Sequence, residues 1–256
     1  MIRFDFLMCV NADNPYIDLA INSMLEQNYE NEYGIIIVAN NCTDALYDKL
    51  LSYKNKHQLI TLHRTSIGQV AFNLNYGANL SNADYLVRMD ADDICELNRL
   101  QLTERFILEN DYPDVVSGSI NLINEDGFLL KSILNEYNER SLKKIIPFKN
   151  VICHPATALK RSSLIQARGY LGGLNGEDYD LWVRMLRLNF KFILFPEVVL
   201  SYRLSSFQVR GSSIGYADGV GTRLREFLLG NGCLFLAGFF IALLKFVIFK
   251  IFRKMK

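Results

Sequence analysis

Three aspartates, Asp90, Asp92 and Asp93, follow directly on an apolar run in YLVRMDADDICE, residues 85–96. Mg²⁺ and Mn²⁺ prefer oxygen ligands, and they typically combine one or two carboxylates with phosphate oxygens and water. Asp90 and Asp92, two residues apart at the end of an expected strand, would suit a nucleotide's ribose and its metal-bound diphosphate. The alternative is a solvated acidic turn, in which Asp93 caps the segment that follows.

Apolar runs and helical spacings alternate along the first half of the chain. The expected strands are residues 4–10, 33–41, 58–63 and 84–90. The first expected helix has Asn14 as its cap and Pro15 in its first turn, and its apolar positions run from Ile17 to Leu25. Further helices are expected after a Thr43 cap and at residues 69–80 and 97–109. This alternation predicts a parallel sheet covered by helices, and such sheets bind ligands at the carboxyl ends of their strands. We therefore expect Asn11–Asp13, Ala39–Asn41 and Asp90–Asp93 to lie along one edge.

The second half of the chain is more mixed. Further strands are expected in DVVSGSINLI, VICHPATALK, FKFILF and VVLSYRL, with a helix at 177–188. Serine and glycine are frequent at 205–222, which is consistent with a linker. We predict an α/β domain at residues 1–222, with a mostly parallel central sheet flanked by helices, and a separate tail at 223–256.

The tail combines an apolar run with basic residues. GCLFLAGFFIALL, residues 232–244, has no charge, and Lys245, Lys250, Arg253, Lys254 and Lys256 follow. A single helix over 232–249 would be about 27 Å long, close to the ~30 Å hydrocarbon core of a bilayer. We expect this helix to contact the membrane, with an interfacial position favoured over a spanning one because Lys245 interrupts it. The alternative is a terminal helix docked on the protein's own core.

Composition excludes several classes of protein. Of the 256 residues, 50 % are hydrophobic and 21 % are charged, which fits a globular core and excludes a disordered chain. A formal net charge of +1 gives no support for a nucleic-acid partner. The five cysteines are odd in number and form no CxxC pair, so a disulfide framework or zinc site is not expected and a reducing compartment fits better.

Several stretches resemble glycosyltransferase family 2, the inverting enzymes with the GT-A (nucleotide-diphospho-sugar transferase) fold. ADYLVRMDADDICELNRLQLTERFI resembles the family's DxD region, and HPATALKRSSLIQARGYLGGLNGEDYDLWVRML resembles its acceptor-side segment, which ends in the ED motif. AINSMLEQNYENEYGIIIVANNCTDAL, SIGQVAFNLNYGANLSNADYLVRMDADD and LSYRLSSFQVRGSS are similar to its first helix and second strand, its donor-side helix and its Tyr-Arg segment. These matches occur in the family's order, which makes the set more specific than any single motif.

The resemblance implies that a sugar moves from a nucleotide-diphospho-sugar donor to a hydroxyl, with inversion and with Mn²⁺ or Mg²⁺ as cofactor. Direct displacement needs a base for the acceptor's proton and a Lewis acid for the leaving diphosphate. By resemblance, Asp178 is the catalytic base and Glu177 supports it. Asp92 would hold the cation, and Asp90 would help to bind the nucleotide. Alternatively, Glu177, Asp178 and the structural Asp180 complement the dipole of their helix.

The resemblance adds further candidates on both sides of the site. The nucleotide-sugar-binding residues would also include Asn11, Asn40, Gly68, Asn73 and Arg203. Arg203 would approach the diphosphate, whereas Gly68 is alternatively a turn glycine. On the acceptor side, His154 is expected either to contact acceptor or diphosphate or to be a satisfied buried histidine. Trp182 is either a wall of the acceptor pocket or helix core.

The chain departs from the family pattern on the donor side. Ala39 and Asn40 stand where the second strand usually ends in two aspartates, and Phe72 replaces a basic residue. The nucleotide is therefore not identified, and a non-catalytic subunit that binds a partner glycosyltransferase or the membrane is the alternative. Our main hypothesis is an enzyme at the cytoplasmic face of the cell membrane, acting on a lipid-linked or saccharide acceptor in bacterial surface polysaccharide (O-antigen or capsule-like) biosynthesis.

Overall fold

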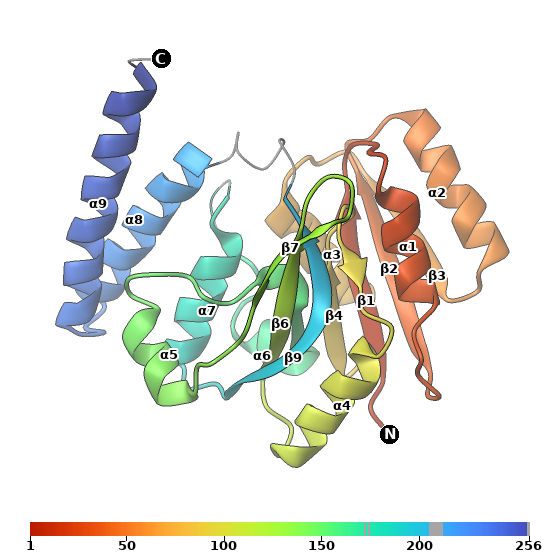
Figure 1. Cartoon of the computed structure of the whole chain (residues 1–256), viewed down its shortest axis with the longest axis horizontal. Coiled ribbons are helices and arrows are strands. Elements are labelled where there is room, and N and C mark those ends of the chain that lie inside the picture. The colour runs from red at the N-terminus through yellow and green to blue at the C-terminus, as the bar shows by residue number, and fades with distance from the viewer. Residues whose placement is uncertain (172, 174, 205–211, 255–256) are drawn as a thin grey trace.

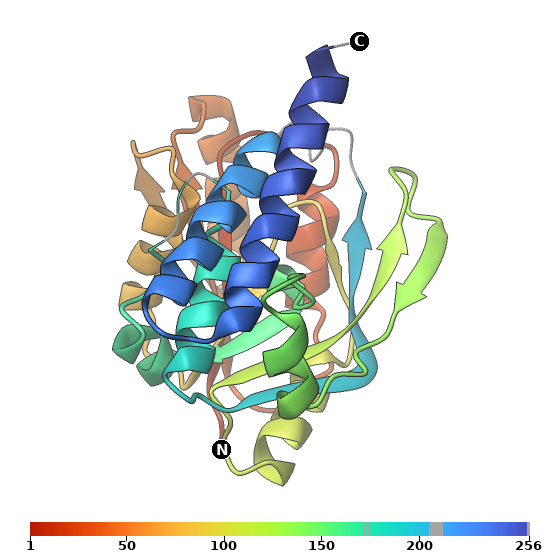
Figure 2. The ribbon, with the colours of Figure 1, turned by 90° about the vertical axis from the view of Figure 1, so that its left-hand side faces the viewer.

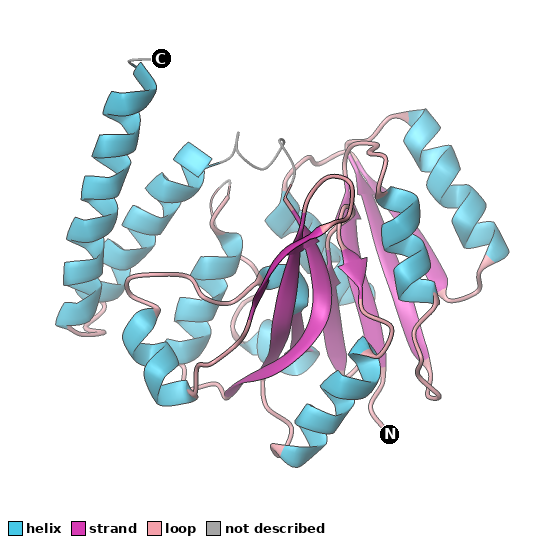
Figure 3. Ribbon diagram, in the orientation of Figure 1, coloured by secondary structure: helices cyan, strands magenta, loops and turns pink. Residues whose placement is uncertain are grey.

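One twisted sheet forms the centre of the molecule (Figures 1 and 3). The computed structural model describes residues 1–171, 173, 175–204 and 212–254. In these residues the strands are β1 (Phe4–Val10), β2 (Tyr33–Asn40), β3 (Ile60–Thr65), β4 (Tyr85–Met89), β5 (Ile94–Cys95), β6 (Val115–Ile123), β7 (Leu129–Ile133), β8 (Thr157–Lys160) and β9 (Phe192–Arg203). Their order across the sheet is β3-β2-β1-β4-β8-β6-β9-β5, and β7 pairs with β6 outside this path.

The parallel half of the sheet confirms the predicted alternation. Strand β1 pairs in parallel with β2 and β4, and β2 pairs in parallel with β3. The sheet as a whole is mixed, because β8 runs antiparallel to β4 and β6, and β5 and β7 are antiparallel edge strands. FKFILF and VVLSYRL form the single long strand β9, which is parallel to β6. The fold is α/β, with parallel pairs among β1 to β4 and between β6 and β9.

Helices cover both faces of the sheet (Figure 3). They are α1 (Ile17–Leu25), α2 (Asp44–Lys56), α3 (Val70–Leu80), α4 (Arg99–Glu109), α5 (Glu139–Ile145), α6 (Arg161–Gln166), α7 (Glu177–Arg187), α8 (Ser212–Leu228) and α9 (Cys233–Lys254), with a short 3₁₀ turn at His154–Ala156. Alternate residues of β1 and β2 face opposite sides, as strand geometry requires. One core cluster includes residues of α1, α2 and α4, and the other includes residues of α3, α5, α6 and α7.

Thr43 caps its helix as predicted, whereas Asn14 and Asp93 do not cap the segments that follow them. The Thr43 side chain accepts a hydrogen bond from Leu46 N, as predicted for the start of α2. Helix α1 begins at Ile17 rather than at Pro15, and its N-cap residue Tyr16 makes no side-chain cap. The Asn14 side chain instead accepts from Tyr16 N at 2.8 Å, which closes a turn before the helix.

The C-terminal helices pack against each other and beside α7 (Figure 2). The predicted boundary at residue 222 falls within α8, and the division into two domains stays a prediction. Phe235 and Ala242 of α9 are buried, and Gly238 lies so close to Pro147 that a Cβ there would overlap the Pro147 carbonyl. Across the described residues, none of the helices combines the length and apolar character needed for a bilayer crossing.

Candidate active site

Polar residues gather where the parallel strands end, as predicted. Asn11 follows β1, Asn40 ends β2, and Asp90 follows β4. A cavity of about 260 Å³ is lined by Cys9, Asn11, Asn40, Gly68, Gln69, Val70, Arg88, Asp90 and Asn175. A second cavity of about 650 Å³ is lined by residues 9–16 and 90–92 and by Glu125. Asn11 and Asp90 line both, so the two cavities adjoin at the strand ends.

The aspartate loop holds a buried ion pair and two carboxyls with raised pKa values. Arg88, which is 5 % exposed, lies with Nη2 2.5 Å from Asp90 Oδ1. Burial, and then the adjacent Asp90 carboxylate, raise the pKa of Asp92 to about 6. The same two causes raise the pKa of Asp93 well above its usual range. Asp93 is fully buried; its Oδ1 accepts from Arg203 N at 2.9 Å, and its Oδ2 has no partner among the described residues.

These features fit a divalent cation bound at Asp92. Three carboxylates crowded into one loop resist full ionisation even beside Arg88, and a cation would reduce that penalty. The described residues contain no cluster of three or more histidine, cysteine or acidic side chains that could enclose a metal. A cation here would therefore draw most of its ligands from phosphate oxygens and water, which is how Mg²⁺ is commonly held with nucleotides.

Arg203 anchors the aspartate loop through hydrogen bonds to its backbone. It is 1 % exposed, and its Nε donates to Asp92 O at 2.8 Å. Its Nη1 donates to the carbonyl oxygens of Asn124 and Glu125. The guanidinium also lies 4.0 Å from the centroid of the Tyr16 ring. Arg203 thus ties the end of β9 to the DxD loop and to the 124–125 turn, while its predicted contact with the diphosphate stays a prediction.

The ED pair lies at the start of α7 and faces the same region as Asp90. A cavity of about 340 Å³ is lined by Asp90, Ile152, Cys153, His154, Pro155, Asn175, Glu177, Asp178 and Tyr202. Burial raises the pKa of Glu177 to about 7, and its Oε2 has no partner among the described residues. Burial also raises the pKa of Asp178 above its ordinary value. Asp178 Oδ2 accepts from Asn150 Nδ2 at 3.0 Å, and Oδ1 accepts from Tyr179 N at 2.6 Å.

The neighbouring acid Asp180 has a different environment. It is 3 % exposed, its Oδ2 lies 2.7 Å from Arg184 Nε, and its Oδ1 pairs with Arg225. Asp180 therefore joins α7 to α8 inside the protein, in agreement with the structural role expected for it. The three acids at this helix start are thus not equivalent, and a shared role in complementing the helix dipole does not describe them all.

The two acceptor-side candidates lie in contact but at different depths. His154 lines the cavity shared by Asp90 and Asp178, and its Nε2 lies 2.9 Å from Tyr170 OH. Burial, and then the Arg88 charge, lower the pKa of His154 well below its ordinary value, so the ring is neutral. Trp182 is fully buried with its ring centroid 5.8 Å from that of His154. Trp182 belongs to the core, and it lines none of the cavities formed by the described residues.

The two donor-side candidates on the segment before α3 also differ. Gly68 lines the 260 Å³ cavity, and a Cβ there would lie 3.2 Å from Asn41 Nδ2. Asn73 is fully buried, and its Oδ1 accepts from Thr65 Oγ1 at 2.6 Å. Its Nδ2 donates to the carbonyl oxygens of Ile67 and Gln69, each at 2.7 Å. Asn73 therefore shapes the loop around Gly68 and does not line the cavity.

Sequence reasoning missed two polar residues at this site. Arg88 interrupts an otherwise apolar strand, and a buried charge in such a run signals a partner nearby. Asn150 supports Asp178 from 28 positions away, and nothing in the local sequence predicts that contact.

Comparisons with known proteins identify the family that this chain resembles. The model of the family described as Glycosyl transferase family 2 matches residues 6–168. The O-antigen biosynthesis glycosyltransferase WbnJ of Escherichia coli is 34 % identical over 226 residues, which cover 87 % of each chain. The UDP-Gal:alpha-D-GlcNAc-diphosphoundecaprenol beta-1,3-galactosyltransferase of Escherichia coli is 25 % identical over 192 residues, 72 % of this chain and 68 % of that relative.

A solved structure shows the same fold. It is the mannosyltransferase PcManGT from Pyrobaculum calidifontis in complex with GDP-Man and Mn²⁺, and the TM-score is 0.68 at 15 % identity. The match covers 88 % of this chain but only 64 % of that one, less than two thirds of its length.

Proposed function

The chain belongs to glycosyltransferase family 2, and from that premise we propose that it is a metal-dependent, inverting enzyme of surface polysaccharide biosynthesis. It is a glycosyltransferase with the GT-A fold, and its donor is a nucleotide-diphospho-sugar. One observation carries the proposed mechanism: Asp90 of the DxD loop and Asp178 of the ED pair line a single cavity of about 340 Å³. Two acidic motifs 88 residues apart thus meet around space for one sugar.

The donor occupies the strand-end cavities in this proposal. The nucleotide extends past Asn11, Asn40 and Gly68, which line the 260 Å³ cavity, and its diphosphate lies beside Asp90 and Asp92. A bound Mn²⁺ or Mg²⁺ supplies charge neutralisation for the leaving diphosphate. Asp92 provides the carboxylate for that cation, and Arg203 and Arg88 hold the loop that carries it.

Asp178 is the proposed base. The acceptor hydroxyl attacks the anomeric carbon, the bond from that carbon to the diphosphate oxygen breaks, and the hydroxyl proton passes to Asp178. A raised pKa makes a carboxylate a better proton acceptor than an exposed aspartate. Asn150 and Tyr179 N fix the carboxylate's orientation, and each oxygen keeps a lone pair for the proton.

A lipid-linked acceptor is part of the same proposal. The galactosyltransferase relative is named for a diphosphoundecaprenol acceptor, and the WbnJ relative for O-antigen biosynthesis. An enzyme that acts on such an acceptor works at the membrane surface, and peripheral contact at the cytoplasmic face agrees with the reducing compartment expected from the cysteines.

A non-catalytic role is the second candidate, motivated by two residues. Ala39 is fully buried, and the exposed Phe72 stacks on Tyr76 with centroids 6.4 Å apart. Neither offers a donor contact of the kind that the family pattern supplies there.

The two candidate functions predict different results when the protein is given a nucleotide-sugar donor but no acceptor, a condition in which an enzyme slowly hydrolyses the donor. An enzyme should release nucleoside diphosphate from one of UDP-, GDP-, TDP- or CDP-sugars when Mn²⁺ is present, and Asp92→Asn should abolish that release. A folded protein that hydrolyses none of them, with or without Mn²⁺, would favour the non-catalytic subunit.

A further inference from the structure

A fourth cavity lies on the other side of Asp178, between the start of α7 and helices α8 and α9. We infer that it binds the phosphate-bearing end of a lipid-linked acceptor, an inference that rests on the proposed function. Its volume is about 470 Å³. Its lining residues are Phe148, Lys149, Asn150, Asn175, Gly176, Asp178, Tyr179, Gly215, Tyr216, Gly219, Arg223, Ile241, Ala242 and Lys245.

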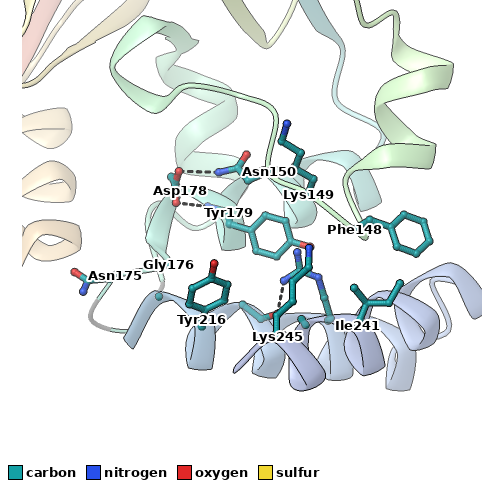
Figure 4. A pocket seen from close by; sticks show the side chains of 14 residues that line it. Phe148, Lys149, Asn150, Asn175, Gly176, Asp178, Tyr179, Tyr216, Ile241 and Lys245 are labelled. Carbon is teal, nitrogen blue, oxygen red and sulfur yellow. Dashed lines mark hydrogen bonds between the residues drawn. The ribbon is translucent and has the colours of Figure 1, made fainter. Parts of the chain in front are cut away.

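Cations dominate the walls of this cavity. Lys149, Arg223 and Lys245 line it together with one carboxylate, Asp178, among the described lining residues. In Figure 4, Lys245 extends from α9 toward Tyr179, and Lys149 lies on the loop across the cavity. No hydrogen bond or ion pair is recorded for either ammonium group within the described part of the chain, so both are available to an anion. A concave site with excess positive charge recognises phosphate.

Arg223 shows that this positive charge is built into the fold. It is 8 % exposed, although a buried arginine usually has a carboxylate partner. Its recorded partners are the carbonyl oxygens of Pro147 and Gly219, and it lies 4.5 Å from the centroid of the Tyr179 ring. The buried guanidinium of Arg223 therefore has no ion-pair partner among the described acids. Its positive charge favours the entry of an anion into the cavity.

The surface beside the cations is apolar, which selects a lipid over a soluble phosphate. Ile241, Leu244 and Ile248 recur at helical spacing on α9, and they are 43 %, 60 % and 44 % exposed. Ile241 also lines the cavity, next to Lys245 one turn along. An amphiphile could therefore place its phosphate against Lys245 while its hydrocarbon chain follows the exposed side of α9.

Asp178, the proposed base, connects this cavity to the proposed site of sugar transfer. Asp178 and Asn175 line both the cationic cavity and the one that contains Asp90. Gly173 and Gly176 allow the loop before α7 to approach α8, because a Cβ on either would overlap the Asp218 side chain. A sugar attached to a phosphate held by Lys149 and Lys245 would thus present its hydroxyl to the base from the side opposite the donor.

The test is calorimetric binding of farnesyl diphosphate to the whole chain in EDTA, which keeps divalent cations away from Asp92. Inorganic pyrophosphate and farnesol are the matched probes for phosphate alone and lipid alone. We expect farnesyl diphosphate to bind more tightly than either probe. Lys149→Glu with Lys245→Glu should weaken it about tenfold or more, since contacts between ammonium groups and phosphate are charge-assisted. Both lysines are exposed, so the double variant should fold.

Lys144→Glu is the control, because Lys144 is an exposed lysine on α5 outside this cavity. It should leave farnesyl diphosphate binding unchanged. Equal binding by the wild-type and the double variant would overturn the inference, and so would pyrophosphate binding as tightly as farnesyl diphosphate. Nucleotide binding with Mn²⁺, measured on the same protein variants in buffer without EDTA, reports the donor site separately. Its loss in every variant and in the wild type would contradict the proposed function, while its retention in the double variant would confine the defect to the acceptor cavity.

Discussion

Arg88 Nη2 lies 2.5 Å from Asp90 Oδ1, so the first aspartate of the DxD loop is held by a buried cation of its own strand. Asp92, two residues later, has a pKa raised by burial and by Asp90 itself. The two carboxylates therefore differ in kind. Asp90 is fixed in place by Arg88, and Asp92 is the acid whose charge is best relieved by an incoming cation.

Asp90→Asn should destabilise the protein because it leaves the guanidinium of Arg88, 5 % exposed, without its carboxylate. We expect the free energy of unfolding, measured by urea denaturation, to fall by about 1–3 kcal/mol. The loss should lie toward the smaller value because Asp90 itself is partly exposed. Asp44→Asn is the matched control: Asp44 pairs with Arg64 at 2.6 Å, but its side chain is 86 % exposed. It should cost under about 1 kcal/mol, and equal losses would show that burial of Arg88 contributes nothing.

Asp178→Asn should abolish sugar transfer while leaving the fold and nucleotide binding intact, because it removes the proposed base. Thermal unfolding and calorimetric binding measure the two properties that should persist. Asp180→Asn, two residues away, should do the opposite: it breaks the buried contacts with Arg184 and Arg225 and lowers the unfolding temperature. Near wild-type turnover by Asp178→Asn would remove that residue from the base role.

Acid should weaken the binding of nucleotide with Mn²⁺. Asp92 must be deprotonated to hold a cation, and its pKa without one is about 6. Affinity should therefore be constant above about pH 7 and fall by up to about tenfold per pH unit well below pH 6, as protons compete with the cation. Calorimetry across this range measures the effect. An affinity that does not change between pH 7 and about pH 5 would place the cation elsewhere.

Gly238→Ala should displace α9, because a Cβ at Gly238 would overlap the Pro147 carbonyl. We expect a loss of about 1–3 kcal/mol in unfolding free energy from this steric conflict. Gly221→Ala is the same substitution on α8 with nothing within 4 Å of the new Cβ, and it should stabilise by about 0.5–1 kcal/mol. If both variants behave alike in urea unfolding, α9 does not pack on the 147 loop in solution.

Much of the donor side could be predicted from local sequence. The strand ends at Asn11, Asn40 and Asp90 follow from alternation of apolar and helical patterns, because parallel strands share one carboxyl edge. These strand ends depend on periods of two and of about 3.6 residues, which a sequence displays directly. The choice of Asp178 as base comes from the resemblance to the family's ED motif, and it stays a prediction.

Other features depend on contacts between distant segments, which a single sequence does not display. Strand β8 inserts antiparallel between β4 and β6, so the sheet is mixed. The sequence allows Trp182 to be either a wall of the acceptor pocket or helix core, and it is core because it packs on His154 and Phe192. The sequence of the tail resembles a membrane helix because its buried and exposed faces are both apolar. The buried Phe235 and Ala242, and the contact of Gly238 with Pro147, show that one face packs on the protein.

Calorimetric titration of UDP, GDP, TDP and CDP, each with and without Mn²⁺, tests the central claim most directly when it is done on the wild-type and on Asp92→Asn. The account predicts that one nucleotide binds, that its affinity depends on Mn²⁺, and that Asp92→Asn removes this dependence. Absence of binding by all four to the folded wild-type, or binding that neither Mn²⁺ nor Asp92→Asn affects, would contradict a cation-dependent donor site at the DxD loop.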